Sequence, residues 1–204
     1  MSVSTESTNA EEITADQGLM PQQNRWNSAA CHRGLARSGP DRLLVQHNGW
    51  NSGWRSVFAK RPSPNKNSGI FYYEVTIFKE QCNVYIGLAT NQMPLDRCVG
   101  WCKGTYAYGC SGFFLGHAVD GCRESVNGGR PRIKGKPGFG VSDVIGCGVD
   151  LATLQIIYTK NGRCLDTAKL FVDSAADLFP CVTLCDAGDK IEANFGPDFK
   201  CKFK

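Results

Sequence analysis

Residues 70–78 alternate between two kinds of side chain, and this alternation constrains the fold more than any other feature of the chain. The segment reads Ile-Phe-Tyr-Tyr-Glu-Val-Thr-Ile-Phe. In an extended strand, one face would carry the large apolar side chains of Phe71, Tyr73, Val75 and Ile77. A period of two over this length predicts a half-buried β-strand whose aromatic rings supply much of a core.

Six further apolar stretches recur along the chain, each bounded by Gly, Asn, Asp or Pro. They cover Arg42–His47, Asn83–Thr90, Val144–Asp150, Leu154–Thr159, Leu178–Leu184 and Lys190–Phe195. No long window has a helical period, and many short strands separated by turns are typical of an all-β sandwich of two antiparallel sheets. Asn161-Gly162 predicts a tight hairpin, because both central residues of a type I′ turn need positive φ.

Individual residues within these stretches lead to further predictions. Gly87 and Gly146 interrupt apolar strands, where a missing side chain permits a bulge or the close approach of another group. The layer between the two sheets is predicted to contain Val144, Ile145, Val149, Ile156 and Tyr158. Three segments without a strand pattern predict extended loops, over Asn48–Asn67, Gln92–Thr105 and Cys122–Gly140.

Acidic side chains are concentrated at the N-terminus. Residues 1–24 contain no Lys or Arg and four acidic residues, Glu6, Glu11, Glu12 and Asp16, although the net charge of the chain is +4. This composition predicts a short flexible tail over residues 1–24 and a single domain over residues 25–204. The mildly basic charge of the domain indicates either an acidic partner surface or simply solubility. No motif indicates binding to nucleic acid, and no apolar run is long enough to span a membrane.

The 11 cysteines are an odd number without regular spacing, so they indicate a reduced protein rather than a disulfide framework. Cys147 and Cys181 stand where core residues are expected. A zinc site is the less favoured alternative, with ligands from Cys98, Cys102, Cys110 and His117 or from Cys181 and Cys185. None of the three histidines lies in a catalytic motif, so we predict no enzyme activity, cofactor or metal.

Several motifs occur in one order along the chain and together resemble the SPRY domain. They are YYEVTI (72–77), YIGLAT (85–90), VGW (99–101), YAYG (106–109), DVIGCGVDL (143–151), YTKNG (158–162), LFPCVTL (178–184) and EANFGP (192–197). The resemblance covers residues 25–197. It implies a SPRY-type sandwich and a non-catalytic module that is monomeric and binds other proteins.

The resemblance also implies where a partner protein binds, since SPRY partners dock on loops at one end of the sandwich. A first loop contains Asp96, Arg97, Trp101, Cys102, Lys103 and Gly104, and a second contains Asp186, Ala187 and Gly188. SPRY proteins with a SOCS box have an aromatic residue in the first loop and a tryptophan in the second. This chain has Trp101 but Ala187, so we expect its ligand to differ from theirs.

Three tryptophans leave alternatives open. Trp101 is either a binding anchor or a ring packed on the rim of the core. Of Trp50 and Trp54, we expect one to be packed and the other exposed.

A basic run offers an electrostatic patch that could steer an acidic partner, and the alternative is an ordinary solvated loop. Its members are Arg123, Arg130, Arg132, Lys134 and Lys136.

Within the SPRY family, the chain is similar to the scaffold called Ran-binding protein in the microtubule-organising centre, and more so to secreted effectors of plant-parasitic cyst nematodes. That similarity implies a parasite protein that is secreted and acts in the cytoplasm or nucleus of the host cell. Its partners would be host signalling, ubiquitin-pathway or immune-receptor proteins. The alternatives are an adaptor in the organism's own cells and a lectin-like sandwich that binds carbohydrate.

Overall fold

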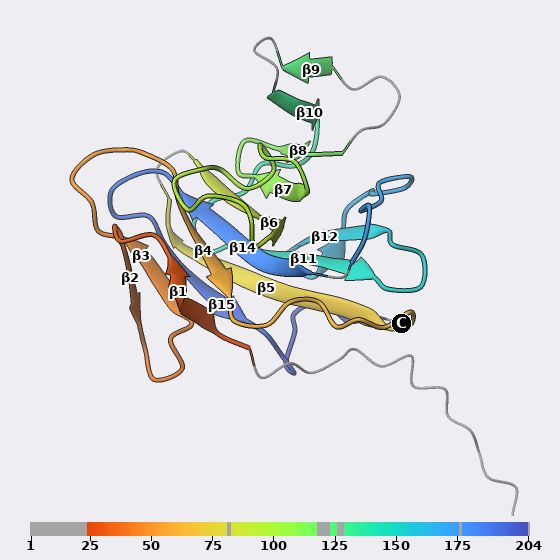
Figure 1. The fold of residues 1–204 in the computed structure, drawn as a ribbon, viewed down its shortest axis with the longest axis horizontal. Helices are drawn as coiled ribbons and strands as arrows, with labels where there is room; N and C mark the ends of the chain where they lie inside the picture. The colour runs from red at the N-terminus through yellow and green to blue at the C-terminus, as the bar shows by residue number, and fades with distance from the viewer. Residues whose placement is uncertain (1–23, 81–82, 118–122, 126–128, 176, 204) are drawn as a thin grey trace, which may run out of the picture.

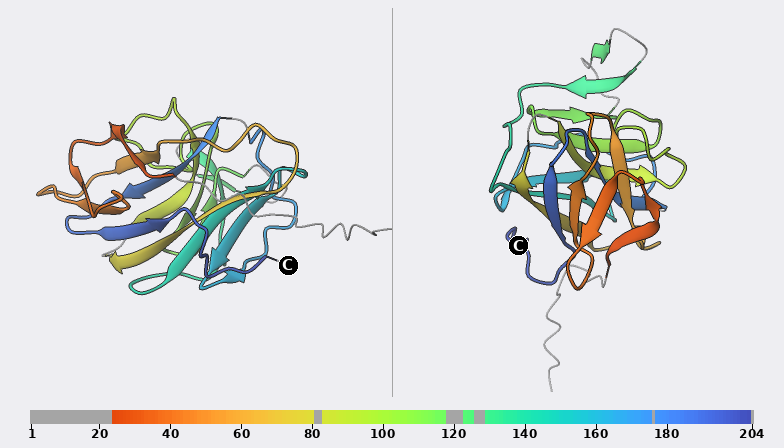
Figure 2. Two further views of the ribbon diagram at one scale, coloured as in Figure 1. Left: turned by 90° about the horizontal axis from the view of Figure 1, so that it is seen from below. Right: turned by 90° about the vertical axis from the view of Figure 1, so that its left-hand side faces the viewer.

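The computed structural model describes residues 24–80, 83–117, 123–125, 129–175 and 177–203. In these ranges the chain folds into two packed antiparallel sheets (Figures 1 and 2), which confirms the predicted all-β architecture. The described residues include no helix that could cross a membrane.

One sheet has eight strands among the described residues. In spatial order they are β1 (Trp26–Cys31), β4 (Arg55–Ala59), β14 (Leu178–Leu184), β6 (Val84–Thr90), β7 (Thr105–Gly109), β8 (Phe113–Leu115), β10 (Gly129–Ile133) and β9 (Arg123–Ser125). The other sheet has seven, in the order β13 (Arg163–Cys164), β12 (Ile156–Lys160), β11 (Val144–Asp150), β5 (Ile70–Lys79), β15 (Lys190–Asn194), β3 (Leu44–His47) and β2 (Leu35–Ser38). Many strands that are neighbours in a sheet, such as β4 and β14, are far apart in the sequence, so their contacts join distant parts of the chain.

The main core lies between the sheets and is built as the alternation in β5 predicts. Phe71, Tyr73, Val75 and Ile77 are at most 1% exposed. They join one cluster with side chains of the facing sheet, among them Ile86, Leu88, Val182 and Leu184. The Tyr73 hydroxyl crosses the layer and donates to the carbonyl oxygens of Gly87 at 2.7 Å and Cys181 at 3.2 Å. Its polar end is therefore satisfied inside an apolar core.

The prediction for Val144 was wrong. In β11, Ile145 pairs with Val75, and both face the core, whereas Val144 pairs with Thr76 on the outer face and is only partly buried. Because side chains alternate along a strand, Val144 and Ile145 cannot point into the same layer. The other four predicted members of the layer, Ile145, Val149, Ile156 and Tyr158, are fully buried.

Both interrupting glycines allow close approach, as predicted. A Cβ on Gly87 would lie 1.9 Å from the carbonyl oxygen of Tyr106 on β7, and one on Gly146 would lie 1.8 Å from the Tyr72 hydroxyl. The Asn161-Gly162 turn between β12 and β13 is also confirmed, with φ of 52° and 80°.

Two predicted loops contain strands. Asn48–Asn67 includes β4, and Cys122–Gly140 includes β9 and β10. In β4, Ser56, Val57 and Phe58 are all buried because both faces of this strand are covered, so the strand shows no alternation. Strands β9 and β10, of three and five residues, are too short to give a periodic signal.

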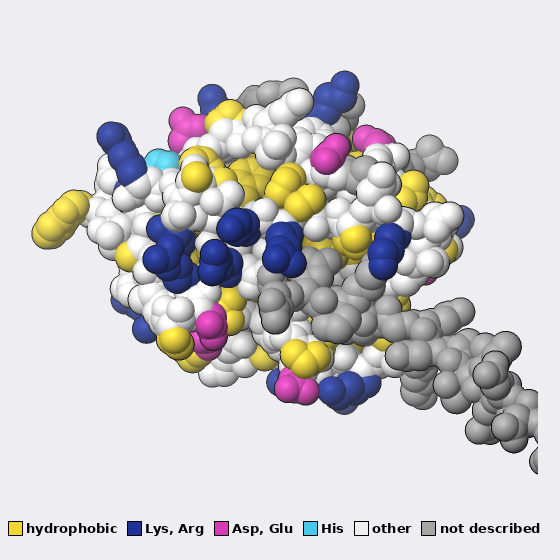
Figure 3. All heavy atoms as spheres, turned by 60° about the horizontal axis from the view of Figure 1, so that its bottom comes forward, with side chains coloured by type: hydrophobic (Ala, Val, Ile, Leu, Met, Phe, Trp, Pro, Cys, Tyr) yellow, Lys and Arg dark blue, Asp and Glu magenta, His cyan; other side chains and the backbone are white. Residues whose placement is uncertain are grey.

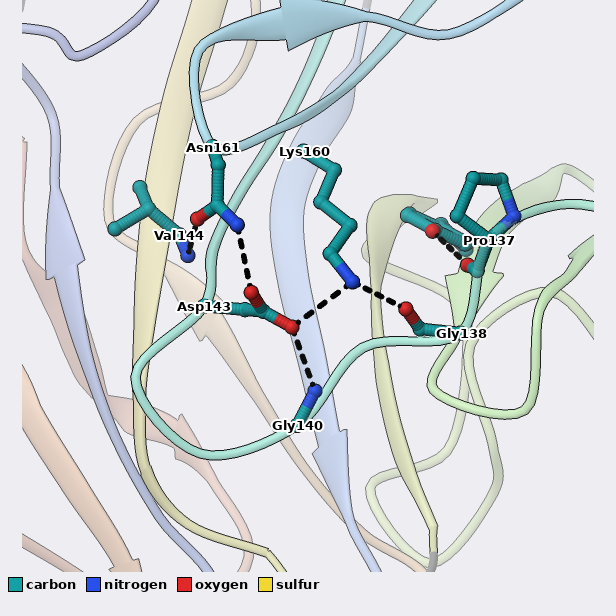
Figure 4. A network of polar contacts seen from close by, with 8 residues as sticks. Pro137, Gly138, Gly140, Asp143, Val144, Lys160 and Asn161 are labelled. Atoms are coloured by element: carbon teal, nitrogen blue, oxygen red, sulfur yellow. Dashed lines mark hydrogen bonds and ion pairs between the residues drawn. The ribbon is translucent and has the colours of Figure 1, made fainter.

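A polar network fixes the connection that leads from β10 into β11 (Figure 4). The Asp143 carboxylate lies 3.1 Å from the Lys160 ammonium and accepts hydrogen bonds from Asn161 Nδ2 at 2.6 Å and Gly140 N at 3.0 Å. Lys160 also donates to the carbonyl of Gly138. Partial burial raises the pKa of Asp143, but these hydrogen bonds and the Lys160 charge outweigh it and lower the pKa overall.

Asn24, the last residue of the predicted tail, is attached to the folded domain. Asn24 is buried, its Nδ2 donates to the carbonyl of Arg61 at 2.9 Å, and its Oδ1 accepts from the backbone N–H groups of Arg25 and Arg61. Residues 1–23, to which the rest of the tail prediction applies, lie outside the described residues.

Candidate protein-binding surface

The second predicted loop is a tight turn between β14 and β15 that is fixed from within. The Asp189 carboxylate is fully buried and accepts hydrogen bonds from the backbone N–H groups of Cys185 at 3.2 Å and Asp186 at 2.9 Å. Gly188 has a φ of 92°, a conformation that favours glycine. Asp186 and Ala187 are left partly exposed at the tip of the turn.

The segment that leads into β4 is attached to this turn. Ser52 Oγ donates to Asp186 Oδ1 at 2.7 Å, and Gly53 N donates to the carbonyl of Cys185 at 2.8 Å. On the other side of the turn, Gly188 N donates to the carbonyl of His47 at 2.8 Å. Two neighbouring loops thus form one connected unit.

The first predicted loop begins at the opposite end of the sheet and folds back across its outer face. Thr90, where the loop starts, pairs with Leu178, whereas the second loop follows Leu184, which pairs with Val84 at the other end of β6. Ser56 on β4 holds the returning segment, since its N–H donates to the Leu95 carbonyl at 2.8 Å and its Oγ to the Arg97 carbonyl at 2.7 Å.

An apolar cluster separate from the main core lies beneath the returning segment. Met93, Cys98 and Val99 of the loop are buried against side chains on the outer face of the sheet, including Phe58, Tyr85 and Cys181. Val99 N also donates to Thr183 Oγ1 at 3.0 Å. The loop therefore has its own core, which holds its exposed residues in a defined position.

Trp101 is both packed and exposed. Its ring lies 5.2 Å from the ring of Trp54, at an angle of 45°, and 38% of the residue remains accessible. Trp54 directly follows the segment bound to the second loop, so the pair joins the two predicted loops. Trp50 is fully exposed, which confirms the prediction that one of Trp50 and Trp54 is packed and the other exposed.

Arg55 connects a further turn to this unit. Its guanidinium donates to the carbonyl of Gly34 at 3.1 Å and to the backbone and side-chain oxygens of Asn51. Burial lowers the pKa values of His32 and His47, and the Arg55 charge lowers both further. Nothing in the local sequence pattern pointed to Arg55 or Ser52, because their roles depend on loops distant in the chain.

The structure brings together only some of the predicted binding residues. Asp96, Arg97 and Trp101 are exposed on the returning segment, on the sheet face beside β4. Lys103 and Gly104 stay near the start of the first loop, where Gly104 accepts a hydrogen bond from Thr90 N at 3.3 Å. Cys102 is partly buried and lies between these two groups in the sequence.

The basic run lies elsewhere. It belongs to β9, β10 and the following residues, and β6, β7 and β8 separate β10 from β14. At about 4.8 Å per strand, this corresponds to roughly 19 Å. Arg132 lies 4.3 Å from the centre of the Phe113 ring, and Lys136 donates to the Asp166 carbonyl at 2.9 Å, whereas Lys134 is exposed. The side chains of Arg123 and Arg130 lie outside the described residues.

Four buried thiols are poor candidates for catalysis. Burial raises the pKa of Cys98, Cys147 and Cys181 well above the ordinary value, and that of Cys110 to about 11. The neutral thiol, not the nucleophilic thiolate, therefore predominates near neutral pH. Within the described ranges, no group of three His, Cys, Asp or Glu side chains is arranged to hold a metal ion.

Comparison with known families gives a match to the SPRY domain over residues 70–198, more than half of the chain. The chain belongs to the SPRY domain family. SPRY domains are generally non-catalytic modules for protein–protein interaction.

The structure is similar to a human SPRY domain, with a TM-score of 0.66 and 19% identity over 82% of this chain and 98% of that one. The SPRY domain of human HERC1 gives a TM-score of 0.58 and 18% identity over 82% and 96%. These structures confirm the predicted SPRY-type sandwich.

The similarity to Ran-binding proteins is also confirmed. This SPRY chain is 39% identical over 144 residues to Ran-binding protein 9 of Xenopus laevis, covering 69% of the chain and 24% of that protein. It is 36% identical over 145 residues to the Drosophila melanogaster homologue of Ran-binding proteins 9 and 10, covering 70% and 14%. The chain thus spans a quarter or less of the length of these relatives.

Proposed function

We propose that this SPRY module binds a partner protein through a surface made by three loops. We call it the loop surface and define it by Trp50, Trp54, Asp96, Arg97, Trp101, Asp186 and Ala187. The observation that carries the proposal is the Trp54–Trp101 pair, because Trp54 packs against the ring of Trp101 while Trp101 stays accessible to a partner. Tryptophan is enriched among the residues that contribute most to protein interfaces.

The construction of the loop surface supports this role. Its loops are held by the Ser52–Asp186 hydrogen bond, by the two Ser56 hydrogen bonds and by the apolar cluster under the first loop. A surface ordered before binding loses less conformational entropy when a partner docks. Ala187 in place of a large side chain makes the second loop shallow, which favours a partner different from those of SOCS-box relatives.

We further propose that the module is a secreted parasite effector that acts in the cytoplasm or nucleus of a host plant cell and modulates or triggers immunity. Support comes from the ordered SPRY motifs and from the Cys-rich loops and long basic insertion, which resemble those of cyst-nematode effectors. Host signalling, ubiquitin-pathway or immune-receptor proteins are the proposed partners. A bound protein, rather than catalysis by this domain, would produce the effect.

Affinity capture from plant-cell extract tests both parts of the proposal. The bait is the full chain, compared with a double variant, Trp101→Ala with Ala187→Glu, and with Phe171→Ala. Phe171 is a matched control because it is another exposed aromatic residue, 51% accessible, outside the loop surface. We expect the wild type and the control to capture the same host protein and the double variant to lose it. Equal capture by all three would remove the loop surface as the binding site.

A second candidate is an adaptor in the organism's own cells. The 39% identity to Ran-binding protein 9 of Xenopus laevis favours it. The same baits in nematode extract separate the candidates. A partner that depends on the loop surface in nematode extract, with none in plant extract, would favour the adaptor and contradict the effector.

A further inference from the structure

A groove lies at the opposite end of β4 from the loop surface. Its walls come from the start of β1, the turn between β2 and β3, the residues that follow β4 and the end of β15, and its volume is about 1150 Å³. The loop surface joins β4 at Arg55, whereas Lys60 and Arg61 of the groove follow Ala59. Five residues of strand separate the two by roughly 17 Å, so the two regions are independent.

Positive charge dominates the lining of this groove, which we call the basic groove. It contains four cationic residues, Arg25, Arg42, Lys60 and Arg61, and two acidic ones, Asp41 and Glu192. All four cationic residues are exposed. Lys and Arg side chains gather in a row on the face seen when the bottom of Figure 1 is turned forward (Figure 3).

The cationic side chains of the groove have no protein partner in the described part of the chain. The Lys160–Asp143 pair is the salt bridge found there, and no side-chain hydrogen bond involves the four cationic residues. Neighbouring positive charges repel one another, and a bound anion would relieve this repulsion. The groove therefore suits a negatively charged ligand.

The backbone beneath these charges is fixed. Asn24 accepts hydrogen bonds from the N–H groups of Arg25 and Arg61, both at 3.0 Å, and Lys60 N donates to the Arg25 carbonyl at 2.8 Å. These bonds join the beginning of β1 to the end of β4. Three of the four cationic residues are thus anchored on a rigid base, while their side chains remain available.

The mixed lining distinguishes between kinds of anionic ligand. An uninterrupted phosphate backbone would bring negative charge close to Asp41 and Glu192 as well as to the cations. The one aromatic residue of the lining, Phe195, is only 5% exposed, so it offers no face on which a base could stack. A peptide can place acidic side chains near the cations and neutral ones near the two carboxylates.

We propose that the basic groove is a second interaction surface, which binds an acidic peptide segment of a partner protein. It would act alongside the loop surface, so one partner could contact both ends of β4 or two partners could bind together. Two linked contacts strengthen binding without any new interaction, if the partner can span both sites.

Fluorescence anisotropy with the full chain tests this proposal. The probe is a labelled 12-residue peptide of alternating Glu and Ser, with a Gln-and-Ser peptide for comparison. We expect saturable binding of the acidic peptide that weakens several-fold between about 50 and 200 mM salt. The Gln peptide should bind at least tenfold more weakly.

Variants assign the binding to the groove. Arg25→Gln with Arg61→Gln should weaken binding of the acidic peptide at least tenfold, because both side chains lie in the groove and neither makes a hydrogen bond or salt bridge with the described residues. Lys103→Gln with Lys134→Gln is the matched control, since both lysines are exposed outside the groove. Thermal melting checks that both double variants remain folded. Equal effects of the two double variants would overturn the proposal.

Two further results would also overturn the proposal. A 12-nucleotide single-stranded DNA that binds more tightly than the peptide, with the same dependence on Arg25 and Arg61, would assign the groove to nucleic acid. A third variant replaces Glu6, Glu11 and Glu12 by Gln and Asp16 by Asn. If the peptide binds only to this variant, the basic groove is assigned to the chain's own acidic residues. None of these outcomes depends on whether the loop-surface variants lose their partner, so the proposal for the groove and the proposal for the loop surface can fail separately.

Discussion

Glu74 on β5 holds Cys201 near the C-terminus, although 127 positions separate the two residues. Glu74 Oε1 accepts the N–H of Cys201 at 2.9 Å and the hydroxyl of Tyr72 at 3.0 Å, while Oε2 accepts the N–H of Lys200 at 2.8 Å. Only 2% of Glu74 is exposed. The C-terminal segment thus covers the outer face of β5, where Phe199 and Phe203 pack edge-on against Tyr72.

Replacing Glu74 by Gln should destabilise the domain by about 1–3 kcal/mol, because a Gln amide has one acceptor oxygen in place of two and brings two N–H donors into a buried site. The midpoint and slope of urea unfolding measure the change. Glu192→Gln is the matched control, since Glu192 is exposed on the adjacent strand β15. A Glu74 variant as stable as the control would mean that the C-terminal segment is held mainly by its aromatic contacts.

The Asp143 network should stabilise the fold in a pH-dependent way. The folded-state pKa of Asp143 is lowered, so its contribution is present above the unfolded value of about 3.9 and is lost as the pH falls through the folded value. Asp143→Asn should cost about 1 kcal/mol at pH 7, a modest amount because both Asp143 and Lys160 are partly exposed. The difference from wild type, measured by urea unfolding, should shrink toward pH 3. A constant difference across this range would show that the carboxylate charge is not involved.

Alternation reveals the core face of a strand only where its two faces differ, whereas β6 and β14, which are buried on both faces, were predicted from their continuous apolar runs. In β5 the core face follows directly from the alternation, and in β11 the same rule, applied strictly, would have excluded Val144. Strand β4 was missed because the core covers one of its faces and the first loop covers the other. A fully covered strand has no periodic signal to find.

The binding residues were harder to predict than the fold. Family motifs indicated Trp101 and Ala187, but the return of the first loop across the sheet depends on Ser56 and Thr183, which are distant in sequence from the loop. Likewise, the burial of Glu74 depends on the C-terminal segment. Contacts of this kind follow from the assembled topology, and no local pattern contains them.

His47 should make the stability of the domain fall in mildly acidic solution. Burial and the nearby Arg55 charge lower its pKa below the unfolded value of about 6.5, and His32 is affected in the same direction. The unfolded chain therefore binds protons first, and stability should decrease as the pH falls from about 6.5 toward the folded pKa values. His47→Asn keeps an acceptor for the Gly49 N–H but cannot titrate there. Its melting temperature should fall less between pH 7 and 5 than that of wild type, and an equal fall would rule out His47 as the source.

The Ser52–Asp186 hydrogen bond should control the order of the second loop rather than the stability of the whole domain. Asp186 Oδ1 accepts the 2.7 Å bond from Ser52, and within the described residues Oδ2 is buried without a partner. Ser52→Ala removes the bond that offsets the burial of this carboxylate, so the loop should open more often.

Hydrogen exchange followed by mass spectrometry measures this opening. Amides of residues 185–189 should exchange several-fold faster in Ser52→Ala, while the free energy of unfolding should change by less than about 1 kcal/mol. Ser174→Ala is the matched control, because Ser174 is exposed and precedes β14, whereas the second loop follows the other end of that strand. If Ser52→Ala and the control exchange at the same rate, the Ser52 hydrogen bond does not order the turn, which would then be held by the Asp189 hydrogen bonds and by the Gly53–Cys185 and Gly188–His47 backbone bonds.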